Sequence, residues 1–276
     1  MERRNFAQIL READVDIRRE YDRLYSAFYM QKNFDGSGMG FSLREYSAAN
    51  FMNIPFRGTC ISLDDFDDFY EFYYEKIPRN FDIDYLVSFC EYTYNLVMYT
   101  PPIGAFGYMG TLTPNQTYMQ QVLKVIDAIG YMSAQDNFVT IFVPKSAEAI
   151  SVSEIVAPSL SYKVIEYNHY TLQGNLEKKK NILLLLYEKL EPQRPKLKQI
   201  NKTMEDNIFT LFNNLNLRHN NIDEQLTEHY KPFVAEMSEK DLESWYDETY
   251  QLCLLAFLEL DNIERKKKIK ELKANL

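Results

Sequence analysis

The chain has 276 residues, of which 46% are hydrophobic and 26% are charged, and its formal net charge is −9 at pH 7. This composition is typical of a soluble globular protein and supplies enough apolar side chains for one large domain or two modest ones. The negative charge argues against attraction of the whole chain to nucleic acid, although a local basic patch can still bind it.

Cysteine use and the apolar runs indicate the compartment. Cys60, Cys90 and Cys253 are far apart, none belongs to a CxxC pair, and an odd number argues against a disulfide framework. The N-terminus, Met1 to Asn5, leads into a charged helix rather than a signal peptide. The longest apolar run, Ile182 to Tyr187, is too short to span a bilayer. We therefore expect a cytoplasmic protein that does not bind a membrane.

The first hundred residues are predicted to be helical. Apolar residues recur at helical spacing over residues 6–29, and the following residues, 33–40, contain three glycines and predict a loop. Two further helices are predicted over residues 42–54 and 62–76. Each segment begins with a serine followed three residues later by an acidic residue, which is the pattern of a capping box. A further helix is predicted over 82–99, where two prolines end it.

A linker and a hairpin are predicted next. Residues 103–112 are rich in glycine for this chain and predict a linker, so we place a domain boundary at residue 112. Thr113 and Pro114 then begin a helix that ends at Gly130, where a C-cap glycine belongs. Residues 131–143 are β-branched and aromatic around a turn at 135–137, which predicts a small β-hairpin.

The rest of the chain again follows helical periodicity. The predicted helices cover residues 147–156, 159–170, 175–190, 195–212 with a break near Lys202, and 238–273. The expected fold is therefore mainly α, a multi-helix bundle with one small β-hairpin near 131–143. We divide it into an aromatic-rich helical region, 1–112, and a second helical region with the hairpin, 113–276.

Most signatures of catalysis and of cofactor binding are missing from the sequence. It has no glycine-rich nucleotide-binding motif, no nucleophile elbow and no second E-x-x-H to match Glu166 and His169. The acidic residues of segment 64–75 suit the first turns of a helix, so we interpret them as a solvated face. With three histidines in the chain, we expect neither a metal nor a cofactor. The basic runs 178–180 and 265–268 favour solvated helix ends, with a nucleic-acid contact as the alternative.

The most informative segment is Asn213–Asn221, in which asparagines surround an adjacent Arg–His pair. Arg218 can hold a phosphoryl oxygen and His219 can transfer a proton, so these two are the candidate catalytic residues. The candidate binding residues are Asn214, Asn216, Asn220 and Asn221. A structural interpretation stays open beside the functional one, because asparagines also cap helix ends through side-chain hydrogen bonds.

A family resemblance rests on an ordered set of short motifs between about residues 118 and 221. A helix ends in Gly130-Tyr131, the hairpin closes on Val143-Pro144, and Ser159-Leu-Ser-Tyr-Lys-Val-Ile follows. Gly174-Asn-Leu-Glu-Lys-Lys then leads into a helix that ends in Leu190-Glu191, before Leu217-Arg218-His219. This order resembles the helical region of bacterial abortive-infection proteins of the AbiJ type and their HEPN-like relatives.

The resemblance implies a role in phage defence, with RNA cleavage as the family's activity. HEPN nucleases have four to six residues between their Arg and their His, whereas His219 follows Arg218 directly and His229 is too far along the chain. We therefore expect a soluble bacterial protein that acts by binding, whose partner is a protein, itself or RNA. The alternatives are a HEPN-like metal-independent ribonuclease that uses Arg218 and His219, and a homo-oligomeric scaffold.

Overall fold

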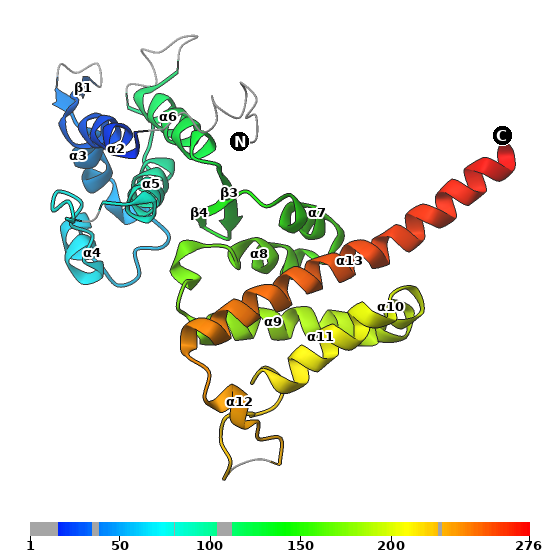
Figure 1. Cartoon of the computed structure of the whole chain (residues 1–276). Coiled ribbons are helices and arrows are strands. Elements are labelled where there is room, and N and C mark those ends of the chain that lie inside the picture. Colours follow the sequence, from blue (N-terminus) through cyan, green and yellow to red (C-terminus); the bar gives the residue numbers. More distant parts are fainter. Residues whose placement is uncertain (1–15, 35–38, 80, 104–111, 226–227) are drawn as a thin grey trace, which may run out of the picture. The chain divides into compact units, whose positions relative to one another are not determined.

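The computed structural model has a mainly helical fold, as predicted, and divides into two compact units (Figure 1). Unit 1 comprises residues 1–144 and unit 2 comprises residues 145–276. The structure describes residues 16–34, 39–79, 81–103, 112–225 and 228–276. The first part of the predicted helix 6–29 and most of the predicted linker 103–112 lie outside the described residues.

Unit 1 consists of helices and two short antiparallel strand pairs. Its elements are α2 (Ile17–Tyr25) with a π-helical turn (Ser26–Met30), β1 (Asn33–Phe34), β2 (Gly40–Phe41), α3 (Leu43–Ala49), a 3-10 turn (Phe51–Asn53), α4 (Leu63–Tyr70), α5 (Ile83–Met98), α6 (Pro114–Ala128), β3 (Tyr131–Asp136) and β4 (Val139–Pro144). The pair β1–β2 lies at the ends of a segment for which the sequence predicted only a loop.

The helix starts of unit 1 follow their capping residues. Ser42 and Thr113 both form complete capping boxes, and Ser62 accepts a hydrogen bond from the backbone N–H of Asp65. The predicted helix 62–76 is too long, however, because α4 ends at Tyr70 and its C-cap residue, Glu71, has a φ of 58° in the left-handed region. After this turn the chain leaves the helical path.

The predicted hairpin is confirmed as β3 and β4, with its turn one residue later than expected. Asp136 pairs with Val139, so Asn137 and Phe138 form the turn, and Asn137 has a positive φ of 50°. The hairpin packs on α5 and α6, and the Asn95 side chain forms two 2.7 Å hydrogen bonds with the backbone of Thr140. These contacts join α6 and the hairpin to the helices before them, and the two compact units divide after Pro144.

The core of unit 1 is aromatic, and a buried ion pair lies at its edge. Arg44 Nη2 lies 2.7 Å from an Asp64 oxygen and 2.6 Å from an Asp67 oxygen, while the Tyr92 hydroxyl donates to Asp67 at 2.7 Å. Two carboxylates of the predicted acidic face are thus partners of one arginine. Burial raises the pKa of Asp67, although Tyr92 and Arg44 oppose that shift.

Unit 2 is built from helices that pack around the long last helix. Its elements are α7 (Ala147–Ile155), α8 (Pro158–Glu166), a 3-10 turn (Tyr170–Leu172), α9 (Leu176–Leu190), a second 3-10 turn (Glu191–Gln193), α10 (Arg194–Ile200), α11 (Lys202–Asn214), α12 (Pro232–Ala235) and α13 (Glu239–Asn275). The predicted break near Lys202 is confirmed, because Asn201 ends α10 and caps α11.

Helix α13 contacts α7, α9, α10 and α11 and supplies much of the core of unit 2. A buried lysine links α9 to α13, because Lys179 Nζ lies 2.7 Å from carboxylate oxygens of both Glu243 and Asp247. The rings of Tyr167 and Tyr250 stack beside this pair, with centroids 4.0 Å apart. The helices packed on α13 therefore hold the two ends of the loop between α11 and α12.

Three further observations concern membrane-spanning helices, metal binding and the cysteines. No helix within the described residues is both long and apolar enough to cross a membrane. Across the same residues, no three His, Cys, Asp or Glu side chains gather closely enough to hold a metal ion. Cys60, Cys90 and Cys253 are all buried free thiols.

Candidate functional site

The predicted polar cluster lies where α11 ends and its following loop begins. α11 ends at Asn214, and Asn216 then adopts a φ of 54°, a left-handed conformation that asparagine accepts more readily than most residues. The backbone N–H of Arg218 donates to the carbonyl of Phe212 at 3.0 Å. The chain therefore turns back at the helix end, and this turn sets the position of Arg218 and of the next residue, His219.

Asn221 is fully buried and organises the loop. Its Nδ2 donates to the carbonyls of Asn213 at 3.1 Å and His229 at 2.8 Å, and its Oδ1 accepts from the Asn216 N–H at 2.7 Å. Its own carbonyl accepts from the Lys231 N–H at 2.8 Å. Buried amides are normally satisfied in this way. Asn221 thereby holds the segment that contains His229 against the end of α11.

The other candidate asparagines are also engaged by the backbone. Asn214 Nδ2 donates to the carbonyl of Thr210 at 2.8 Å, and Asn220 Oδ1 accepts from the N–H groups two and three residues later at 3.2 Å. These bonds favour the structural interpretation of the asparagines. Arg218 and His219 are therefore the residues of this segment that remain candidates for binding or catalysis.

The structure places two histidines in contact, although the sequence interpretation rejected His229 because of its distance along the chain. The ring centroids of His219 and His229 lie 4.1 Å apart with an interplanar angle of 31°. Loss of hydration lowers the pKa of His219. The positive charges of protonated His229 and of Arg218 lower it further. The neutral form of His219 is thus favoured near pH 7, and a neutral imidazole can accept a proton.

Arg218 is oriented by side chains from the end of α9. Its guanidinium carbon lies 5.3 Å from the centroid of the Tyr187 ring, and its Nη2 lies 3.7 Å from a Glu191 oxygen. The Tyr187 hydroxyl donates to the same Glu191 oxygen at 2.6 Å, and burial together with that carboxylate raises the pKa of Tyr187 to about 12. Arg218 remains 44% exposed, so these contacts orient its guanidinium and leave it accessible to a ligand.

Arg218 and His219 line an open, mainly polar depression on unit 2, which we call the Arg218 hollow. Its walls include Lys180, Arg218, His219, Asp223, Glu224 and Tyr230. Lys180 Nζ donates to the carbonyl of Asn216, and burial lowers the pKa of Lys180. The sequence places Lys180 in the basic run 178–180, but nothing in it connects Lys180 with Arg218, and Tyr230 was missed altogether.

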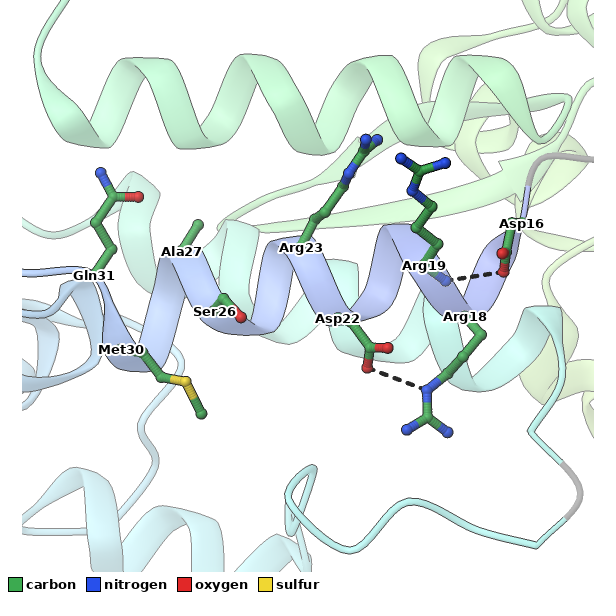
Figure 2. A pocket seen from close by; sticks show the side chains of 9 residues that line it. All are labelled: Asp16, Arg18, Arg19, Asp22, Arg23, Ser26, Ala27, Met30 and Gln31. Carbon is green, nitrogen blue, oxygen red and sulfur yellow. Dashed lines mark hydrogen bonds and ion pairs between the residues drawn. The ribbon is translucent and has the colours of Figure 1, made fainter.

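A second depression lies along α2 in unit 1 (Figure 2). Figure 2 shows Arg19 and Arg23 extending from one side of the helix and Arg18 and Asp22 lying on the other. Arg18 pairs with Asp22 at 3.1 Å, and Arg23 pairs with Glu20 at 2.7 Å. Two of the three arginines on this surface therefore already have carboxylate partners.

Comparison of the chain with models of known families, with curated proteins and with solved structures finds no match. The resemblance to abortive-infection proteins therefore stays a prediction from sequence motifs. The side chains of the Arg218 hollow nevertheless define its chemistry. They offer a fixed arginine, a lysine, the His219 imidazole and a phenol ring, opposed by two carboxylates, and the His229 ring lies against His219.

Proposed function

We propose that this protein acts by binding single-stranded RNA at the Arg218 hollow. The observation that carries the proposal is the meeting of Arg218, Lys180 and His219 in one open depression, with the His229 ring against that of His219. Cations supply phosphate affinity and aromatic rings supply faces for unpaired bases, and single-stranded RNA offers both partners.

The two cations suit phosphate contacts. A guanidinium forms two parallel hydrogen bonds to a phosphate, and Tyr187 and Glu191 already orient that of Arg218. The Lys180 ammonium has three N–H donors and uses one of them on the Asn216 carbonyl. Among the described residues its other two donors have no protein partner, so they can reach a ligand in the hollow.

The rings favour unpaired bases over a duplex. Tyr230 lines the hollow, and the His229 ring lies against His219. Bases stack on such rings only when they are not already stacked within a helix. Asp223 and Glu224 limit the positive charge of the hollow, so we expect few phosphate contacts and a shallow dependence on salt.

Binding of a fluorescently labelled single-stranded RNA, followed by anisotropy, tests this function. Arg218→Gln is expected to weaken binding about tenfold, since a charge-assisted hydrogen bond contributes roughly 1.5 kcal/mol. It should also reduce the slope of log K against log salt by about 0.7. Lys240→Gln, an exposed change elsewhere in unit 2, is the control with the same change of charge. Equal binding by both variants, or tighter binding of duplex RNA, would contradict the proposal.

RNA cleavage is a second candidate function, which the contact between His219 and His229 favours. His219, as the neutral base, would take the proton of a ribose 2′-hydroxyl, whose oxygen then attacks the neighbouring phosphorus. His229 would protonate the 5′-oxygen that leaves, and Arg218 would stabilise the charge on the phosphoryl oxygens. Loss of cleavage in both His219→Ala and His229→Ala, with RNA binding retained, is the expected result. Unchanged cleavage in either variant excludes this mechanism.

For the biological setting, the resemblance described above favours phage defence. Bacteria that express the wild-type protein should then suppress phage plaques, and bacteria that express Arg218→Gln should not. Equal plaque numbers for both would show that RNA binding at the Arg218 hollow does not act in phage defence.

A further inference from the structure

The C-terminal part of α13 lies outside the core of unit 2. Figure 1 shows the red end of this helix running past the other helices of its unit, and residues 264–276 are all exposed. Exposed apolar side chains nevertheless occur along it: Leu255 is 45% exposed, Ile269 52% and Leu272 59%. Side chains of this kind on a projecting helix indicate a contact with another surface.

This part of α13 follows the spacing of a coiled coil. The three-four repeat places Leu255, Leu258, Asn262, Arg265, Ile269 and Leu272 on one stripe of the helix, of which Leu258 is half-buried and also packs against the core of unit 2. Two apolar residues lie at each end of this stripe and two polar residues lie at its centre. A stripe with this symmetry about its own middle can pair with a copy of itself that runs in the opposite direction.

We propose that this stripe forms an antiparallel two-helix contact with the same stripe of a second copy of the chain. In the matching register, Leu255 faces the partner's Leu272 and Leu258 faces the partner's Ile269. The central layer then brings Asn262 against the partner's Arg265, where the amide oxygen can accept from the guanidinium. A polar central layer of this kind fixes register in coiled coils.

The charges beside the stripe agree with this orientation. In the antiparallel register Glu259 lies near the partner's Lys266, and Asp261 lies near the partner's Lys268. Two-fold symmetry repeats both pairs, so all four flanking contacts join opposite charges. In a parallel pair, by contrast, Lys268 would lie near the partner's Lys273. Asp261 now pairs with Arg265 at 2.5 Å within the helix, an exposed i,i+4 pair that is weak enough to be exchanged.

The contact closes on itself. The stripe extends over about 27 Å of helix, and each copy offers the same surface to the other. Such isologous contacts give closed dimers rather than filaments. The proposal concerns residues 255–272 only and is independent of RNA binding at the Arg218 hollow.

Sedimentation velocity over a wide range of protein concentration tests the proposal. The wild-type chain is expected to reach twice its 32.7 kDa mass, and Leu272→Glu is expected to stay monomeric. Position 272 is 59% exposed, so this change should leave folding intact, as circular dichroism can verify. A wild-type chain that is monomeric at all concentrations, or a dimeric Leu272→Glu, would overturn the proposal.

Charge variants test the orientation. Lys266→Glu/Lys268→Glu makes all four flanking positions acidic, and Glu259→Lys/Asp261→Lys makes them all basic. Each variant is expected to be monomeric alone, and an equimolar mixture of the two is expected to form a dimer. Lys267→Glu/Lys270→Glu makes the same change in charge on the outer face and should remain dimeric. Dimers of either flanking variant alone, or a mixture that stays monomeric, would refute the antiparallel pairing.

Discussion

Replacement of Asn221 by alanine should destabilise unit 2 through one loop. The change removes three side-chain hydrogen bonds, to Asn213, Asn216 and His229, inside a fully buried site. Each such bond contributes about 0.5–1.5 kcal/mol net, and partners left unsatisfied in a buried site add to the loss. We therefore expect the free energy of unfolding to fall by roughly 2–4 kcal/mol. Asn221→Asp should cost at least as much, because it turns a second oxygen toward two carbonyls.

Chemical unfolding followed by tryptophan fluorescence measures this loss. Trp245 is the only tryptophan and lies on α13, so its signal reports on unit 2. Asn214→Ala is the matched control, since it removes a single exposed bond and places a better helix former in the last turn of α11. If Asn221→Ala and Asn214→Ala change the free energy of unfolding equally, Asn221 does not organise the loop.

Other buried or titrating groups give three more expected outcomes. Lys179→Met should lower the free energy of unfolding of unit 2 by roughly 1–3 kcal/mol, measured by the same fluorescence, because two carboxylates on α13 lose their cation. The pKa of His219 is lower in the folded protein than its ordinary value near 6.5, so His219 contributes to stability above pH 6.5. This contribution is lost as the pH falls through the lower pKa of the folded protein. His219→Gln should remove this part of the pH dependence of the unfolding midpoint. Burial raises the pKa of the Cys90 and Cys253 thiols, so both should react with a thiol reagent only as the protein unfolds.

The starts of helices could be predicted because capping is local. Ser42 and Thr113 find their partners three residues later in the sequence, and Asn201 separates two helices within one apolar pattern. These interactions require no knowledge of distant segments. The hairpin at 131–144 was predictable for the same reason, since its strands are joined by two residues.

The end of α4 could not be predicted, because distant contacts decide it. The apolar and acidic pattern continues past Glu71, yet the helix stops there. The following aromatics pack on α5 instead: the Phe72 ring lies 5.2 Å from that of Tyr92, and the Tyr74 ring lies 5.2 Å from that of Phe89. Such contacts bury large aromatic surfaces, which outweighs the small helix propensity of a few residues.

The contact between His219 and His229 was beyond prediction for a related reason. Distance along the chain seemed to separate His229 from His219, yet the Asn221 side chain bonds to the His229 carbonyl and brings the two rings together. A buried asparagine that joins two segments and an exposed one in a flexible turn look identical in sequence. The same amide group therefore determines both the stability of the loop and the pairing of the histidines. If this reasoning is right, Asn221→Ala should also weaken RNA binding, although Asn221 does not line the Arg218 hollow.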